Sequence, residues 1–398
     1  MSTVERNKLK LAYEGSVKRV WQCPWQDDSL LFEFTDDYSI FDWGKMPDTI
    51  ENKGRALAVF GAYFFERLSK PEFWQWLTQQ EAPQHLCREF LSALSASKTM
   101  QTLQTEGLSS HYQGLVDQSG EHLSLSKAAR LAGSVYMQVQ KALVQRPHAV
   151  VVLNQNVFHY PEVDHSAKTR LIPLEVVFRF GLPAGSSLTE RLKKDPSYAA
   201  TLGLKKQPQE REMFERPLLE FYTKLEPKDR LLSVQEAMLI SGLSAEQFCE
   251  LVERAQASCL ALYYLFWQAG IELWDGKFEF VLCDGKILLA DSIGPDELRL
   301  LYKGTHLSKE MIRQVYRGSS WESALKQAQK LAKERCSLDW KGICQRELNE
   351  QPEPLNQPAR DVLNKLYGVL ANSLSGEELF EKHHSLDEFA ATARANGL

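Results

Sequence analysis

Two alternating runs of apolar and charged residues constrain the fold of this chain more than any other feature. The first run reads Asp275-Gly276-Lys277-Phe278-Glu279-Phe280, and the second ends in Leu288-Leu289-Ala290-Asp291. A period of two is typical of a strand with one buried face and one polar face. We therefore expect a β-hairpin that turns at or near Asp284-Gly285.

The length of this turn decides which charged residues of the hairpin share a face. A two-residue turn at Asp284-Gly285 would point Glu279 and Asp291 to opposite faces. A three-residue loop that includes Cys283 would place both carboxylates on one face, together with Lys277. Two such carboxylates would suit Mg²⁺, which takes one or two carboxylates plus phosphates and waters. A metal site therefore predicts an odd loop length, whereas an ordinary charged hairpin makes no such demand.

An earlier alternating run, from Ile172 to Arg179, predicts another strand. Its apolar residues face one way, whereas Glu175 and Arg179 face the other. A turn with Gly185 and Ser186 follows, and it offers N–H and hydroxyl donors beside the forked donors of the arginine. Such donors suit a phosphate group. An exposed strand face with opposite charges four residues apart would give the same pattern.

The N-terminal region carries a glycine turn and a serine–aspartate segment. In Tyr13-Glu14-Gly15-Ser16-Val17-Lys18, a glycine at the tip of a hairpin would let backbone N–H groups approach phosphates, and the lysine would add a positive charge. Further on, Ser39 and Asp42 could hold a polar ligand, and Lys53 a phosphate. The alternative for the glycine turn is an ordinary hairpin with a solvated lysine. The alternative for the serine–aspartate segment is a turn followed by a helix start.

Helical periodicity dominates most of the remaining chain. Residues 70 to 145 are expected to be mostly helical, with Val135 and Val139 on one helix face. Ser244-x-x-Gln247 is a capping box that predicts the start of a long helix. The chain is again expected to be helical from residue 319 to its end. Helices in these segments and strands elsewhere indicate an α+β protein.

Charge, hydropathy and cysteine usage exclude several classes of function. The formal net charge of −5 argues against a general attraction to nucleic acid or to acidic lipid. The longest apolar stretch, Cys259 to Trp267, is too short to span a membrane. The seven cysteines form no C-x-x-C pair, so neither a disulfide framework nor a zinc site is expected. We expect a cytoplasmic protein that binds small molecules, and neither nucleic acid nor membranes.

The motifs follow one another in an order that resembles the SAICAR synthetases (phosphoribosylaminoimidazole-succinocarboxamide synthases). The order is Y-E-G-x-x-K, D-x-x-S-x-F-D, I-P-x-E-V-V-x-R, the K-F-E-F hairpin, and P-D-x-x-R at residues 295 to 299. The resemblance covers roughly residues 8 to 69, 149 to 190 and 215 to 315. It implies a two-lobed α+β fold, similar to ATP-grasp enzymes, with ATP between the lobes.

Three consecutive parts are expected from this resemblance. Residues 1 to 150 would form the N-terminal ATP-binding lobe, with an added helical segment at about 70 to 145. Residues 151 to 318 would form the larger lobe, with the substrate and metal site. Residues 319 to 398 would form a helical C-terminal extension that exceeds the family's usual length.

The resemblance implies an ATP-dependent carbon–nitrogen ligase of de novo purine biosynthesis. Such an enzyme condenses CAIR, a carboxylated aminoimidazole ribotide, with L-aspartate to give SAICAR, ADP and phosphate. The carboxylate is activated as an acyl phosphate, and the aspartate amine then displaces phosphate. Positioning and charge neutralisation dominate such chemistry. Mg²⁺ is the implied cofactor, ATP the co-substrate, and a homo-oligomer is compatible with the family.

The resemblance also assigns roles to residues at matching positions. Catalysis would rest on Lys277, Glu279, Asp291 and Lys224, with Glu279 and Asp291 as the Mg²⁺ ligands. ATP would be bound by Gly15, Ser16, Lys18, Lys277 and Glu279. The other substrates would be bound by Ser39, Asp42, Lys53, Glu175, Arg179, Ser186, Asp229, Asp296 and Arg299. Among these, Arg179, Ser186 and Arg299 would grip the ribotide phosphate.

Several positions depart from the family pattern. Asp291-Ser292 stands where D-E is usual, and Lys228-Asp229-Arg230 stands where the family has an acidic H-D-E cluster. The turn from Gly294 to Arg299 lacks a serine of the usual S-P-D-x-S-R. These departures leave two alternatives open. One is a ligase of the same fold that acts on a different acid or amine, and the other is a non-catalytic binding protein.

Overall fold

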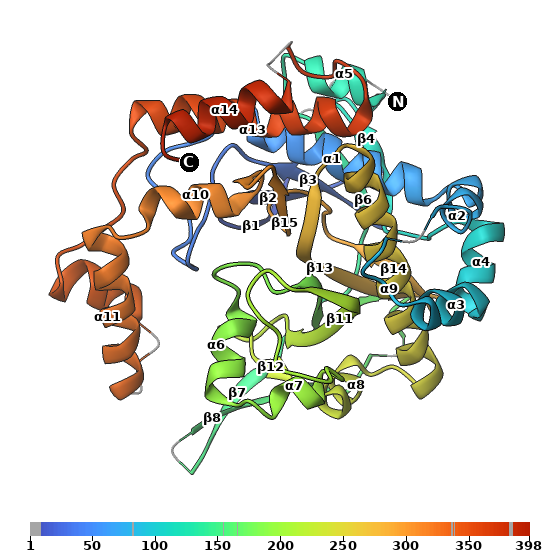
Figure 1. The fold of residues 1–398 in the computed structure, drawn as a ribbon, viewed down its shortest axis with the longest axis horizontal. Helices are drawn as coiled ribbons and strands as arrows, with labels where there is room; N and C mark the ends of the chain where they lie inside the picture. The colour runs from blue at the N-terminus through green and yellow to red at the C-terminus, as the bar shows by residue number, and fades with distance from the viewer. Residues whose placement is uncertain are drawn as a thin grey trace. The chain divides into compact units, whose positions relative to one another are not determined.

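The computed structural model describes residues 9–81, 83–153, 155–164, 166–335, 337, 339–381 and 385–398 (Figure 1). Its contacts divide the chain into two compact units, each made of segments that are distant in sequence. The first unit comprises the chain through Phe60, Leu115–Met137 and Leu301–Leu398, and the second comprises Gly61–Gly114 and Gln138–Leu300. The lobe boundaries at residues 150 and 318 remain a prediction from the family resemblance.

An eight-stranded sheet contains the predicted hairpin and the strand before it. Its strand order is β12-β11-β10-β13-β15-β16, and β9 and β14 also pair with β13. Within it, β10 pairs antiparallel with both β11 and β13, so the predicted strands are neighbours. The strands are β9 (Thr169–Leu171), β10 (Leu174–Gly181), β11 (Met213–Thr223), β12 (Leu231–Leu232), β13 (Glu272–Cys283), β14 (Lys286–Ala290), β15 (Leu298–Tyr302) and β16 (Thr305–His306).

The long helix α9 (Ala245–Gln268) packs against β10, β11 and β13 and buries the apolar face of that sheet. Its capping box is confirmed, because the Ser244 hydroxyl accepts from the backbone N–H of Gln247 and the Gln247 side chain returns to Ser244. The ring of Phe278 stacks on that of Phe178 at 4.8 Å between centroids. Alternation therefore sends these rings to one face and leaves the charged residues on the other.

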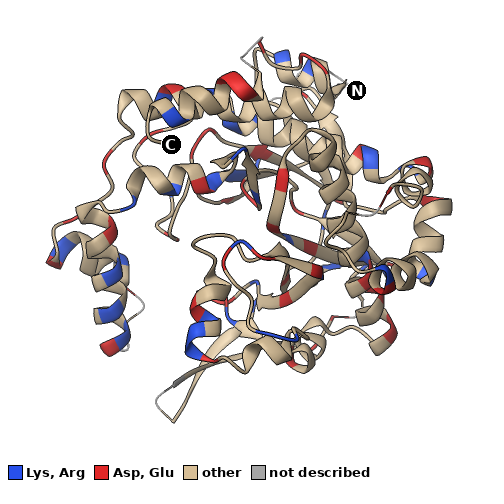
Figure 2. Ribbon diagram, in the orientation of Figure 1, with Lys and Arg blue, Asp and Glu red and all other residues tan. Residues whose placement is uncertain are grey.

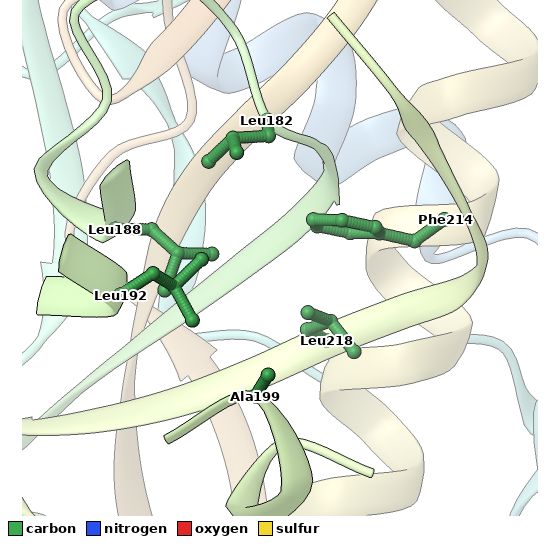
Figure 3. Packing of buried hydrophobic residues seen from close by; sticks show 6 residues of the cluster. All are labelled: Leu182, Leu188, Leu192, Ala199, Phe214 and Leu218. Atoms are coloured by element: carbon green, nitrogen blue, oxygen red, sulfur yellow. The ribbon is translucent and has the colours of Figure 1, made fainter. Parts of the chain in front are cut away.

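A smaller cluster at the other side of β11 involves α6 (Ser187–Lys194) and α7 (Tyr198–Thr201) (Figure 3). Its buried members are Leu182, Leu188, Leu192, Ala199, Phe214 and Leu218. Leu188 and Leu192 lie four residues apart, so they present one helix face to the strand. This packing fixes the start of α6, where the predicted Gly185-Ser186 turn ends.

The segment from residue 70 to 145 is only partly helical. Its helices are α2 (Pro71–Leu77), α3 (Arg88–Ala96), α4 (Lys98–Glu106) and α5 (Leu125–Arg130), and its strands are β4 (Tyr112–Val116), β5 (His122–Leu123) and β6 (Tyr136–Gln140). The helix predicted around Val135 and Val139 is therefore wrong. Four of the five residues of β6 are buried, so both faces are covered and no polar alternation marks the strand.

A second, six-stranded sheet has the order β1-β2-β3-β6-β4-β5. The strands β1 (Leu11–Glu14), β2 (Lys18–Gln22) and β3 (Ser29–Phe34) confirm the hairpin that was predicted near Gly15. Helix α1 (Lys53–Leu68) follows, and Gly54 at its start lies against the backbone of Phe34, where a Cβ would come within 2.3 Å of the carbonyl oxygen.

The remaining elements of the second unit are the hairpin β7 (His148–Val152) with β8 (Gln155–His159), and α8 (Val234–Ser241).

The predicted C-terminal helices are α10 (Lys309–Tyr316), α11 (Ser320–Glu334), α12 (Trp340–Gly342), the π-helical turn η1 (Ile343–Glu347), α13 (Gln357–Ser375) and α14 (Leu386–Ala395). Helices α13 and α14 lie side by side (Figure 1). Helix α11 carries acidic and basic residues along its length (Figure 2). None of the helices in the described parts of the chain is both long and apolar enough to cross a membrane.

The C-terminal helices pack onto the serine–aspartate segment within the first unit. The Tyr38 hydroxyl donates to Asp48 at 2.5 Å, and Arg360 of α13 donates to the same carboxylate at 2.9 Å. The ring of Trp43 meets Trp321 of α11 edge-on at 5.4 Å between centroids. These contacts hold the chain between β3 and α1, so the C-terminal helices stabilise a segment that the sequence analysis placed at a ligand.

Candidate active site

The charged face of the eight-stranded sheet follows from the register of β10 and β13. Val177 pairs with Lys277, and Arg179 pairs with Asp275. Because side chains alternate along each strand, Glu175 and Arg179 share their face with Lys277. Most of these side chains are buried, so their charges must be compensated by partners on the same face.

Four of these side chains form what we call the lysine–glutamate cluster: Glu175, Lys224, Lys277 and Glu279. Lys277 Nζ donates to Glu175 Oε1 at 2.6 Å. Lys224 Nζ, which lies just beyond the end of β11, donates to the same oxygen at 3.0 Å and to Glu279 Oε1 at 2.5 Å. Lys277 Nζ is 3.8 Å from Glu279 Oε1. Each ammonium group therefore lies between two carboxylates.

Burial and the two lysines shift the pKa values of the cluster in different directions. Burial tends to raise the pKa of Glu175, but the Lys277 and Lys224 ammonium groups outweigh it, so that pKa is lowered. For Glu279, burial and then the Asp291 carboxylate outweigh the same two lysines, so its pKa is raised. Burial opposes the charge of Lys224, yet the neighbouring carboxylates raise its pKa. Burial and the Asp291 carboxylate therefore both disfavour the ionised form of Glu279.

The turn of the hairpin has two residues, so the predicted odd-length loop is wrong. Cys283 pairs with Lys286, and Asp284 and Gly285 both have positive φ, at 48° and 79°. A turn with two such residues matches the twist of the flanking strands, and it pairs Glu279 with Ala290. Strand parity alone would then turn Asp291 away from Glu279.

Asp291 nevertheless lies near Glu279, because the strand ends before it. Strand β14 ends at Ala290, and Asp291 adopts a left-handed backbone with φ of 63°. Aspartate tolerates this conformation better than most residues do. The alternation rule does not apply across this conformation. After burial, the Asp291 carboxylate is the next cause of the raised pKa of Glu279. Burial opposes the charge of Lys224, but the Asp291 carboxylate helps to raise the pKa of that lysine. The two carboxylates therefore influence each other by a route that the sequence analysis did not foresee.

His111 supports this backbone and was missed by the sequence analysis. Its side chain is buried, and its Nε2 atom lies 3.1 Å from the carbonyl oxygen of Asp291. Its own backbone N–H donates to the carbonyl oxygen of Leu289 at 2.9 Å. A single histidine between β-strand residues carries no motif, and only the fold brings it to the end of β14. It acts by positioning Asp291.

Arg179 lies at the centre of a second group, the arginine network, with Glu220 and Asp275. Arg179 Nε donates to Glu220 at 2.5 Å, and its Nη1 donates to Asp275 at 3.0 Å. Longer contacts of 3.4 Å reach the hydroxyls of Ser186 and Ser187. Burial opposes the charge of Arg179, but the two carboxylates outweigh it and raise the pKa of the guanidinium. The group is a fully charged, tightly held arginine.

Arg299 joins the same network from the start of β15. Its Nε lies 3.5 Å from Asp275, and its Nη1 donates to the carbonyl oxygen of Ala184 at 3.3 Å. The structure therefore brings Arg179, Ser186 and Arg299 together, as the sequence analysis expected of a shared site. Asp275 was quoted in the hairpin motif without a role, and its alternation with Lys277 could have revealed it. Glu220 carried no comparable signal.

The remaining predicted residues of the second unit lie outside these two groups. Asp229 is exposed in the loop between β11 and β12. Asp296 lies in the turn before β15 and is half-buried. The neighbouring Arg230, which departs from the family pattern, pairs with the buried Glu226 at 3.2 Å. The arginine at this position therefore pairs with a carboxylate of the same chain.

The predicted residues of the first unit lie around β2 and α1. Gly15 and Ser16 form the turn between β1 and β2, and the Lys18 ammonium group lies 4.2 Å from the centre of the Phe32 ring. Asp42 is exposed with φ of 58°, close to the half-buried Ser39. Lys53 is buried at the start of α1, and its ammonium group lies 5.6 Å from the centre of the Tyr367 ring.

A metal ion would depend on few protein ligands at this site. Among the residues that the structure describes, no three His, Cys, Asp or Glu side chains are arranged to hold a metal ion. Glu279 and Asp291 are a pair of carboxylates, and Mg²⁺ is commonly bound by one or two carboxylates together with phosphates. The repulsion of Glu279 by the Asp291 carboxylate favours such a cation.

Comparisons with known proteins agree on one family. A family model described as SAICAR synthetase matches residues 11–330. A protein of Archaeoglobus fulgidus, provisionally named phosphoribosylaminoimidazole-succinocarboxamide synthase, is 31% identical over 88% of this chain and 89% of its own length. The protein of that name from Thermoplasma volcanium is 27% identical, over 80% of this chain and 86% of its own. The solved SAICAR synthase of Saccharomyces cerevisiae in complex with SAICAR is 18% identical, covers 96% of this chain and 99% of its own, and has a TM-score of 0.51.

Proposed function

This chain belongs to the SAICAR synthetase family, and we propose that it condenses CAIR with L-aspartate to form SAICAR, ADP and phosphate. It is an ATP-dependent carbon–nitrogen ligase of purine biosynthesis. The observation that carries the proposal is the lysine–glutamate cluster, which lies on the same sheet face as the arginine network. One group suits phosphoryl transfer and the other suits an anionic substrate.

The reaction requires negative charge to be neutralised where a phosphoryl group moves. We assign Lys277 and Lys224 to this task, because their ammonium groups are held in place by Glu175 and Glu279 and stay charged at neutral pH. Preorganised charges of this kind stabilise a transition state without reorganising during the step. Once the carboxylate of CAIR has become an acyl phosphate, the same lysines would stabilise the departing phosphate.

Glu279 and Asp291 would hold Mg²⁺ in this proposal. The support is electrostatic: burial and Asp291 raise the pKa of Glu279, so a cation at this point would relieve the repulsion between the two carboxylates. Bound Mg²⁺ would neutralise phosphate oxygens of ATP. Lys224 also balances part of this charge through its contact with Glu279.

The ribotide phosphate is assigned to Arg179, Ser186 and Arg299. The 3.4 Å contacts between Arg179 and the two serine hydroxyls are long, so phosphate oxygens could replace them at little cost. The stronger bonds from Arg179 to Glu220 and Asp275 would keep the guanidinium oriented during binding. Aspartate and the ribotide would also use Glu175, Asp229 and Asp296.

The first unit contributes the remaining proposed contacts. By the family resemblance, Gly15, Ser16 and Lys18 would bind ATP phosphates, and Ser39, Asp42 and Lys53 would bind the substrates. The contacts of the C-terminal helices with the segment between β3 and α1 support a fixed geometry for Ser39, Asp42 and Lys53. We retain the cytoplasmic location as a prediction, which the free thiols of the described cysteines support. Self-association also remains a prediction.

The decisive experiment measures ADP release by purified protein with Mg·ATP, CAIR and aspartate, with each omitted in turn. We expect ADP release to require all three, and the product to have the mass of SAICAR. Turnover with a different acid or amine, and none with CAIR and aspartate, would instead establish a ligase of altered specificity. Ser292, Glu297 and Arg230, which depart from the family pattern, would then be the first positions to examine.

A further inference from the structure

Helix α6 presents a polar face beside the arginine network. Leu188 and Leu192 turn one face of this helix into the apolar cluster (Figure 3). Ser187 and Arg191 also lie four residues apart, so they share another face of the helix. Neither of these two residues has a role in the reaction proposed above.

Arg191 is held by the same buried carboxylate that holds Arg179. Its Nη2 atom donates to Glu220 Oε1 at 2.6 Å and to Glu220 Oε2 at 2.9 Å. The centre of its guanidinium group lies 5.8 Å from the ring centres of both Tyr198 and Tyr222. Because the Glu220 side chain is fully buried and also accepts from Arg179 Nε, it fixes the two guanidinium groups relative to each other.

The hydroxyl of Ser187 is shared by these two arginines. Arg191 Nη1 donates to Ser187 Oγ at 3.3 Å, and Arg179 Nη2 donates to the same oxygen at 3.4 Å. Both distances exceed the usual N–H···O range of about 2.7–3.2 Å, so these are weak bonds. A phosphate oxygen that took the place of this hydroxyl would accept from both guanidinium groups.

Solvent reaches this point of the network more easily than the residues already assigned to the phosphate. Ser187 is exposed, whereas Ser186 is buried. The side chain of Arg191 is 23% exposed, compared with 13% for Arg299 and 6% for Arg179. An incoming anion therefore meets Arg191 first among the three arginines.

Arg191 also determines the net charge of the network. The guanidinium groups of Arg179 and Arg299 are balanced by the carboxylates of Glu220 and Asp275. With Arg191, three positive groups face two negative ones, and the net charge becomes +1. A phosphate monoester has a second pKa of about 6 and carries close to two negative charges at neutral pH. Without Arg191 the network would offer such a group no net attraction.

We propose that Arg191 is a further substrate-binding residue, which contacts the ribotide phosphate and gives the arginine network its positive charge. Its Nη2 atom stays bonded to Glu220, while its Nη1 atom exchanges the Ser187 hydroxyl for a phosphate oxygen. This inference rests on the proposed function, because the phosphate belongs to the substrate of that reaction.

Isothermal titration of the full chain with CAIR, and with the riboside that lacks its phosphate, tests the role of Arg191. Arg191→Gln should weaken CAIR binding at least about tenfold, because it removes a charge-assisted bond to the phosphate, and should leave riboside binding unchanged. Glu220 keeps its bonds from Arg179 and from the Tyr198 hydroxyl in this variant, so the fold should be retained, as melting temperatures would establish. Arg191→Lys should bind CAIR with intermediate affinity, since one ammonium group keeps the charge but cannot hold both Glu220 and the phosphate.

Lys193→Gln is the matched control, because it removes the same charge from an exposed position of the same helix, where Lys193 pairs with Glu190 at 3.2 Å. It should leave both affinities unchanged. Equal weakening of CAIR and riboside binding in Arg191→Gln would show a purely structural role and overturn the proposal, as would an unchanged affinity for CAIR.

The same titrations separate this proposal from the proposed reaction. The expected effects on CAIR binding, without ADP release in the presence of Mg·ATP and aspartate, would refute the reaction and support the role of Arg191. Folded wild-type protein that does not bind CAIR would refute both.

Discussion

Replacing Glu279 with glutamine should abolish turnover without destabilising the protein. Around this residue the structure places three carboxylates, those of Glu175, Glu279 and Asp291, and two ammonium groups, those of Lys224 and Lys277. Their sum, two positive minus three negative, is −1. The glutamine variant changes this sum to zero, because it removes one negative charge. Lys224 keeps its 3.0 Å bond to Glu175.

The expected change in stability follows from the pKa of Glu279. Because its pKa is raised in the folded protein, the carboxyl group contributes stability below its unfolded pKa, and that contribution is lost as pH rises through the folded pKa. Above its unfolded pKa the group therefore disfavours folding, and glutamine resembles its protonated form. We expect the free energy of unfolding of the variant to equal or exceed that of the wild type, within about 1 kcal/mol.

Turnover, unlike stability, should fall in this variant. Glutamine retains the size of the side chain but removes the charge proposed to hold Mg²⁺, so kcat should fall at least about 100-fold, as for other groups that stabilise charge in an active site. Urea unfolding at pH 5 and pH 7, with ADP release on the same preparations, measures both effects. The wild type should lose stability relative to the variant as pH rises.

Lys277→Met is the informative counterpart, because it changes the charge sum from −1 to −2. It should also abolish turnover, but with a stability loss of about 3–5 kcal/mol, as for a buried ion pair that loses one partner. Normal turnover in Glu279→Gln would refute the metal assignment. A loss of several kcal/mol in Glu279→Gln would refute the charge count, even if activity were lost as expected.

Three further substitutions test other parts of the structure. Arg179→Lys should raise KM for the ribotide at least about tenfold, because an ammonium group cannot reproduce the fork between Glu220 and Asp275; an unchanged KM in steady-state assays would remove Arg179 from the site. His111→Phe should lower kcat and weaken Mg²⁺ dependence while the melting temperature changes little, since it releases the backbone of Asp291; unaltered Mg²⁺ titration of activity would contradict this role. Trp321→Ala should cost about 3–5 kcal/mol in urea unfolding, because its buried ring packs on Trp43; a loss below about 1 kcal/mol would show that the C-terminal helices contribute little to the first unit.

Local sequence determined the charged face of the central sheet. A period of two in Ile172 to Arg179 and in Asp275 to Phe280 was sufficient to predict that Glu175, Arg179, Lys277 and Glu279 would avoid the apolar face, because strand alternation depends only on neighbouring residues. The start of α9 at Ser244 and the hairpin around Gly15 were predicted for the same reason. Family resemblance then supplied the reaction, which no local pattern contains.

Tertiary structure alone decided how the carboxylates meet and what surrounds them. The turn at Asp284-Gly285 has two residues, yet Asp291 still approaches Glu279, because its left-handed backbone is held from outside the hairpin by His111. Strand β6 was mistaken for helix because burial on both faces erased its alternation. Contacts such as those of Glu220 with Arg179 join residues far apart in sequence, and their pairing depends on strand order, which local propensity does not encode.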